Sequence, residues 1–147
     1  MNGKIICSNK KANYEYFILD KYEAGIKLKG TEIKSIRAGK VSINEAYVEV
    51  KKGKVFIINM FIGKYDFGNI FNHEELRDKE LLLNKSEIRK LANKIKLEGL
   101  TIVPTKAYFK GSLVKIEIAL AKGKKNYDKR ETIKERDEKR RQNKFVY

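Results

Sequence analysis

The chain has 147 residues, of which 34 are Lys or Arg and 19 are Asp or Glu, and its formal net charge is +15. This length suits one compact domain, and a hydrophobic content of 41% is too high for a wholly disordered chain. No apolar run reaches the ~18–20 residues of a membrane span, and we expect no signal peptide. The single cysteine, Cys7, excludes an internal disulfide and favours a reducing compartment. The charge favours an extended anionic partner, with nucleic acid first and an anionic membrane surface second.

The first predicted elements are short. Residues 14–19 and 24–28 are aromatic or apolar and partly alternating, which is typical of strands. Residues 31–38 predict a short helix that Thr31 caps and Gly39 ends.

Two β-hairpins are predicted further along the chain. The first joins residues 46–50 to residues 55–62 through a turn with Gly53 at the positive-φ position. The second joins residues 100–109 to residues 113–120, and regular alternation in the latter indicates a half-buried strand.

A longer helix lies between these hairpins. Asn84 and Glu87 form a capping box, and Gly99 ends the helix. Its apolar face consists of four residues, Ile88, Leu91, Ala92 and Ile95. The cations outside this face are those of an ordinary solvated surface. Together the elements predict a mainly β fold, an OB-fold-like closed antiparallel β-barrel with added short helices and a basic C-terminal tail. An open α+β sheet is the alternative.

The positive charge is concentrated at the end of the chain. Residues 122–144 contain eleven Lys or Arg against five Asp or Glu, a net charge of +6. Ile133 is the only aliphatic residue there, so the segment cannot bury enough apolar surface to fold alone. We therefore predict a barrel domain at residues 1–121 and a tail at residues 122–147, disordered when free and helical when bound. A solvated tail that aids solubility is the alternative.

Catalytic residues are scarce. His73 is the only histidine, and with one cysteine the chain offers no Cys/His zinc site. His73, Glu74 and Glu75 lie in a polar loop, where such residues are usually solvated. An RNA-processing enzyme using His73 and Glu74 is the least favoured hypothesis, and we expect no enzyme activity, metal or cofactor.

RNA binding has better support, because cationic side chains bind phosphates and aromatic rings stack on unpaired bases. Tyr16, Tyr47 and Tyr108 lie in predicted sheet segments, where tyrosines usually pack in the core or on the sheet face. Tyr127 lies between Lys125 and Lys129, and we predict that it contacts RNA.

Six short segments resemble a known family in their order and spacing: SNKKA (8–12), YEAGI (22–26), GTEIKSIRAGK (30–40), LLLNK (81–85), ALAKGKK (119–125) and YDKR (127–130). The chain resembles the SsrA-binding proteins (small protein B, SmpB) of bacterial trans-translation from about residue 8 to residue 136. The resemblance implies an OB-fold protein that binds the tRNA-like domain of transfer-messenger RNA (tmRNA, or SsrA RNA).

The resemblance also implies partners and a place of action. Elongation factor Tu with GTP would deliver the complex to stalled ribosomes in the cytoplasm. The tail would pass the small-subunit rRNA at the decoding centre and become helical in the vacant mRNA channel. By this resemblance the nascent chain would then be tagged, and the protein would perform no covalent chemistry. We expect no membrane partner.

The family's functional positions carry over residue by residue. The tmRNA-binding residues would be Asn9, Lys10, Lys11, Glu23, Leu82, Lys122, Lys124 and Lys125. The tail residues acting on the ribosome would be Tyr127, Asp128, Lys129, Arg130, Lys134 and Arg136. A carboxylate such as Glu23 can accept hydrogen bonds from base amino groups or 2′-hydroxyls, or orient a neighbouring cation. Leu82 could cover a base or simply pack in the core.

The chain differs from the family pattern at three positions. Glu75 stands where proline is frequent, and Tyr127 where some members have histidine. Glu80 occupies a position that is commonly basic, so no phosphate contact is carried over to it. The alternative function is a general OB-fold RNA-binding or ribosome-associated protein without specificity for tmRNA.

Overall fold

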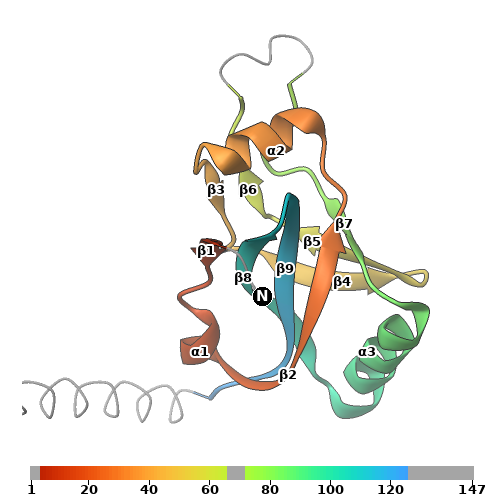
Figure 1. Ribbon diagram of the computed structural model, residues 1–147. Helices are drawn as coiled ribbons and strands as arrows, with labels where there is room; N and C mark the ends of the chain where they lie inside the picture. Colours follow the sequence, from red (N-terminus) through yellow and green to blue (C-terminus); the bar gives the residue numbers. More distant parts are fainter. Residues whose placement is uncertain (1–3, 66–71, 126–147) are drawn as a thin grey trace, which may run out of the picture.

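The computed structural model describes residues 4–65 and 72–125, which form a mainly β structure with a few short helices (Figure 1). The three helices of this part are α1 (Ala12–Glu15), α2 (Gly30–Arg37) and α3 (Lys85–Glu98). Its strands are β1 (Ile5–Ser8), β2 (Tyr16–Ile26), β3 (Val41–Ser42), β4 (Tyr47–Lys51), β5 (Lys54–Ile58), β6 (Phe61–Ile62), β7 (Lys79–Leu82), β8 (Thr101–Lys110) and β9 (Leu113–Gly123). No helix in the described ranges is long and apolar enough to cross a bilayer.

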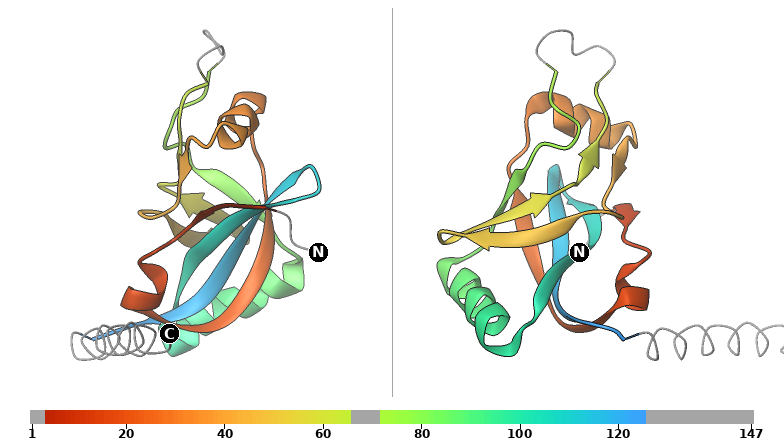
Figure 2. Two further views of the ribbon diagram at one scale, coloured as in Figure 1. Left: turned by 60° about the vertical axis from the view of Figure 1, so that its left-hand side comes forward. Right: turned by 180° about the vertical axis from the view of Figure 1, so that it is seen from behind.

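Seven of the strands form one antiparallel sheet in the order β1-β8-β4-β5-β7-β2-β9. β9, the last strand of this order, also pairs with β8 along the whole predicted second hairpin. β3 and β6 form a separate pair beneath α2 (Figure 1). All three views place α2 at one end of the molecule and α1 and α3 at the other (Figures 1 and 2).

The start of the chain differs from the prediction. The two strands predicted at residues 14–19 and 24–28 are one strand, β2, preceded by the single turn α1. β2 is continuous because β9 pairs with it from Tyr16 to Gly25. Polar residues in its middle hid this continuity, because only one face of β2 is buried.

Alternating side chains build the core. Ile116, Ile118 and Leu120 of β9 are fully buried, which confirms the predicted half-buried strand. Across the core, α3 contributes the fully buried Leu91. The capping box predicted for α3 is confirmed, and Gly99 ends the helix with φ of 63°.

Both hairpin turns are confirmed, but the predicted strand 55–62 is interrupted. Lys51 pairs with Lys54, and Gly53 has the expected positive φ of 75°. Asn59, with φ of 62°, separates β5 from β6. Asparagine tolerates this left-handed conformation better than most residues, so the chain leaves the main sheet here.

Thr31 does not cap α2, contrary to the prediction. The helix begins at Gly30, and the Glu32 carboxylate accepts the Lys29 N–H at 2.7 Å. Thr31 is free for another partner because a backward-reaching Glu satisfies the helix start instead.

Candidate nucleic-acid interface

One row of paired residues connects two segments predicted to bind RNA. Glu23 of β2 pairs with Glu117 of β9, Glu117 with Lys106 of β8, and Lys106 with Ser8 of β1. Because Ala24 is fully buried, its neighbour Glu23 points away from the core. Asn9 follows Ser8 and stays attached to β8 through its N–H and the Thr105 carbonyl, 2.8 Å apart. The row therefore runs on the outer face from Glu23 to Ser8, and Asn9 lies at its far end.

Glu23 is held from both sides. The Tyr108 hydroxyl donates to its Oε2, and Lys110 Nζ lies 3.0 Å from its Oε1. These two hydrogen bonds, that of Tyr108 first, lower the pKa of Glu23. Burial, together with the bond to Glu23, raises the pKa of Tyr108, which keeps its hydroxyl a donor. Glu23 is thus an ionised, oriented and still partly exposed acceptor.

Leu82 lies on the same side of β2. It pairs with Gly25, which on its other side pairs with Lys115. Leu82 is 46% exposed whereas Leu81 is buried, so Leu82 is not a core residue. Together with Leu113 these residues line a hollow of about 240 Å³. A Cβ at Gly25 would approach the Leu82 Cβ to 3.3 Å, so glycine keeps this surface open.

The segment from Asn9 to Lys11 forms a fixed turn. Asn9 Nδ2 donates to the Pro104 carbonyl at 3.0 Å, and its Oδ1 accepts the Lys11 N–H at 3.1 Å. The Asn9 amide is thus used in part to hold the turn. Lys10 is exposed, whereas Lys11 Nζ lies 2.6 Å from the Glu45 carboxylate, a hydrogen bond that raises the pKa of Lys11.

The cations at the end of β9 and just beyond it lie near α1 rather than beside Glu23. Lys124 Nζ donates to the Asn13 carbonyl at 2.8 Å and lies 5.0 Å from the centre of the Phe17 ring. Lys122 and Lys125 are exposed. α1 therefore brings Lys11, which precedes it, near the Lys122–Lys125 segment. The predicted tail residues Tyr127, Asp128, Lys129, Arg130, Lys134 and Arg136 lie outside the described residues.

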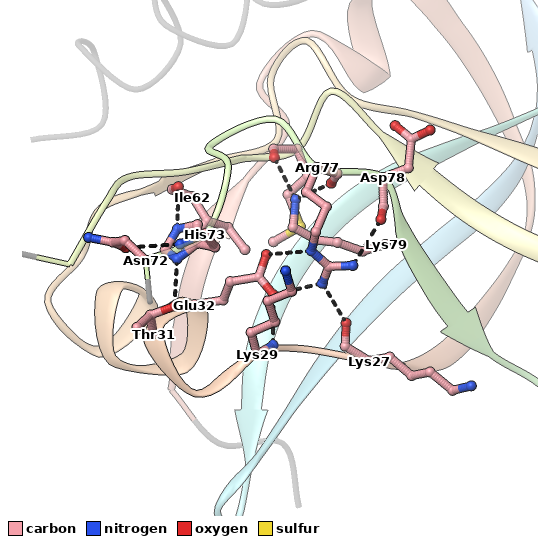
Figure 3. A network of polar contacts seen from close by, with 11 residues as sticks. Lys27, Lys29, Thr31, Glu32, Ile62, Asn72, His73, Arg77, Asp78 and Lys79 are labelled. Atoms are coloured by element: carbon pink, nitrogen blue, oxygen red, sulfur yellow. Dashed lines mark hydrogen bonds and ion pairs between the residues drawn. The ribbon is translucent and has the colours of Figure 1, made fainter. Parts of the chain in front are cut away.

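His73 is not a solvated loop residue, contrary to the prediction (Figure 3). It is only 2% exposed, and its Nε2 donates to the Ile62 carbonyl at 2.9 Å. Its Nδ1 lies 2.9 Å from the Thr31 hydroxyl. His73 thus joins α2 to β6, and both ring nitrogens have protein partners. In the described ranges no three His, Cys, Asp or Glu side chains cluster as metal ligands.

A second buried contact beside His73 was not predicted. Arg77 makes a two-point contact with the fully buried Glu32, through Nη2 at 2.7 Å and Nε at 3.3 Å (Figure 3). Lys79 is also buried and donates to the Met60 carbonyl at 3.0 Å and the Arg77 carbonyl at 2.6 Å. Burial lowers the pKa of Lys79 to about 8. This group fixes α2 on the connection between β6 and β7.

The residues that position Glu23 were also missed. Tyr108 and Lys110 lie more than eighty residues away in the sequence, and only the pairing of β2, β9 and β8 brings them to Glu23. At Glu80, the family departure, the carboxylate lies 3.4 Å from Lys27 Nζ.

Comparison with known proteins assigns the chain to a family. Residues 6–147 match the family model described as "SmpB protein". The chain belongs to the SmpB family. It is 60% identical to the SsrA-binding protein of Acholeplasma laidlawii over 95% of this chain and 93% of the relative. The SsrA-binding protein of Geotalea uraniireducens is 53% identical, with the same coverage of 95% and 93%.

A solved structure described as "tmRNA-SmpB: a journey to the center of the bacterial ribosome" has the same fold. It superposes with a TM-score of 0.67 at 42% sequence identity, over 82% of this chain and 85% of that chain.

Proposed function

We propose that this SmpB family member binds the tRNA-like domain of tmRNA and delivers it to stalled ribosomes for trans-translation. The relatives are named SsrA-binding proteins, and the similar solved structure is described by tmRNA and the ribosome. The observation that carries the proposal is the outer face of β9, β2 and β7, where an oriented Glu23 and an exposed Leu82 occupy one surface, with Asn9 at the far end of the row of paired residues that starts at Glu23.

The fold supports this role as a rigid RNA-binding scaffold. Pairing of β9 with β8 connects β8, β4, β5, β7, β2 and β9 in a ring, which favours an OB-fold-like closed barrel. In this proposal the barrel domain binds tmRNA, whereas the basic tail of residues 122–147 enters the decoding centre and mRNA channel. Elongation factor Tu with GTP acts through the tmRNA complex in the cytoplasm, and the protein catalyses no reaction.

A general RNA-binding protein is the second candidate, and the net charge of +15 favours it. Charge alone, however, does not explain Glu23. A carboxylate repels phosphates, yet two donors hold this one at the surface. Such an oriented acceptor suits the recognition of base amino groups or 2′-hydroxyls in a structured RNA.

Replacing Glu23 by alanine should therefore weaken binding to the tRNA-like domain, although it makes the protein more positive. Loss of a charged hydrogen bond, worth ~1.5–3 kcal/mol, corresponds to roughly 10–150-fold in affinity. Titration with labelled RNA at fixed salt measures the dissociation constant, and urea unfolding confirms that the fold is retained.

Glu49→Ala is the matched control, since it removes the same charge from β4, where Glu49 forms an ion pair with its near neighbour Lys51. We expect unchanged or slightly tighter binding. If both variants bound the tRNA-like domain as tightly as the unmodified chain, Glu23 would have no recognition role and general charge-driven binding would be favoured.

A further inference from the structure

A second hollow adjoins the candidate interface between α1 and the start of β4. Its volume is about 210 Å³, and Asn9 and Lys11 form part of its wall. This is below the ~300 Å³ at which pockets for drug-sized ligands begin. The hollow therefore suits one small planar group rather than a whole nucleotide.

Two tyrosines line this hollow, Tyr16 at the start of β2 and Tyr47 at the start of β4. Tyr47 is 42% exposed, although Ala46 and Val48 on either side of it are buried. Its ring is thus presented on the outer side of a strand whose inner side is in the core. An exposed ring beside a hollow provides a stacking surface that any nucleobase fits.

The charges around the hollow exclude a phosphate as its occupant. Glu15 and Glu45 both line it, and they would repel an anion. Lys11, which is the one lysine among the described residues of the wall, has its Nζ 2.6 Å from the Glu45 carboxylate. Carboxylates instead accept hydrogen bonds from the amino groups of adenine, cytosine and guanine.

We propose that this hollow binds one unpaired nucleobase of the RNA, stacked on Tyr47, with its amino group donating to Glu15 or Glu45. The inference rests on the proposed function, since it places the base next to the Asn9 end of the same interface. It adds a contact that reads the shape of an unpaired nucleotide rather than the phosphate backbone. Phosphates flanking this base would lie outside the hollow, near exposed Lys10.

The test combines Tyr47→Ala with RNA that lacks single bases. Each unpaired nucleotide of the tRNA-like domain is replaced in turn by an abasic one. For every abasic RNA, the dissociation constant is measured with the unmodified chain and with Tyr47→Ala. Stacking on one base contributes ~1–3 kcal/mol, so Tyr47→Ala should bind the intact tRNA-like domain roughly 5–150-fold more weakly than the unmodified chain does. At one position, the abasic site should lower the affinity of the unmodified chain by a similar factor. The same site should not lower the affinity of Tyr47→Ala any further. Tyr47→Phe should bind like the unmodified chain.

Phe61→Ala is the control, because Phe61 is an exposed aromatic residue of β6 that does not line this hollow. Circular dichroism checks the fold of each variant. The proposed base-binding site would be wrong if Tyr47→Ala bound the RNA with unchanged affinity, or if every abasic site lowered the affinity of Tyr47→Ala further by the same factor. Neither result would affect the proposed preference for the tRNA-like domain. If the unmodified chain bound an unrelated RNA equally well, the proposed function would be wrong. The same series of abasic substitutions in that RNA, measured with both proteins, would still test whether the hollow binds a base.

Discussion

Truncation of the chain after Tyr127 is expected to abolish tagging of nascent chains on stalled ribosomes while leaving affinity for the tRNA-like domain largely intact. The described interface residues all precede this point, and Glu23, Leu82 and Asn9 keep the contacts that they make within the described residues. The removed residues carry +3 of the +6 charge of residues 122–144 and five of the six predicted ribosome-acting residues, all except Tyr127. A reconstituted tagging assay and an RNA titration on the same preparation measure the two activities.

The matched control keeps the tail's composition but scrambles the order of residues 128–147. We expect this variant to fail in tagging as well, because Asp128 amid cations indicates a requirement for sequence and not for charge alone. Tagging by the scrambled chain would mean that the tail acts only through its charge. Loss of tmRNA binding on truncation would contradict the separation of two binding functions.

Replacing Arg77 by alanine should lower the free energy of unfolding by about 3 kcal/mol or more, the typical cost of leaving one member of a buried ion pair without its partner. Glu32 is fully buried, and Arg77 supplies two of its hydrogen bonds. Burial by itself raises the pKa of Glu32, but the bonds from Arg77 and the Lys29 N–H outweigh it and lower the pKa. The free energy of unfolding of a folded domain is only ~5–15 kcal/mol, so a loss of this size should be easily measured by urea unfolding.

Lys27→Ala provides the comparison, because Lys27 forms an exposed pair with Glu80 at 3.4 Å. Exposed ion pairs contribute ~0–1 kcal/mol to stability, so Lys27→Ala should lower the free energy of unfolding only slightly. The double variant Glu32→Gln with Arg77→Met should be less destabilised than Arg77→Ala, since it does not leave the buried Glu32 carboxylate charged without Arg77. Equal stabilities of Arg77→Ala and Lys27→Ala would show that the contact in Figure 3 does not hold α2 in place.

The elements that local chemistry determines were predictable. Gly53 and Gly99 occupy positive-φ positions that favour glycine, and Asn84 with Glu87 marks the start of α3. The short strands β1 and β7 were not predicted, because four residues carry too little periodicity and their pairing partners are distant. Thr31 was misassigned as a cap because its hydroxyl bonds to His73, a contact between segments forty residues apart.

The candidate interface was predictable in its members but not in its arrangement. Family resemblance pointed to Glu23 and Leu82, yet only pairing through Gly25 shows that they share a surface. The exposure of Leu82 decided between core packing and an interface role, and composition contains no information on it. Likewise, Tyr47 was expected to be an ordinary sheet residue until the hollow beside it was seen.

The most direct test of tmRNA recognition compares two RNAs of equal length at the same salt concentration, because phosphate contacts make affinity strongly salt-dependent. One is the tRNA-like domain, and the other is an unrelated structured RNA. The proposed function predicts that the full chain binds the tRNA-like domain much more tightly, and that added salt weakens both without removing the preference. Equal affinities at matched salt would contradict it.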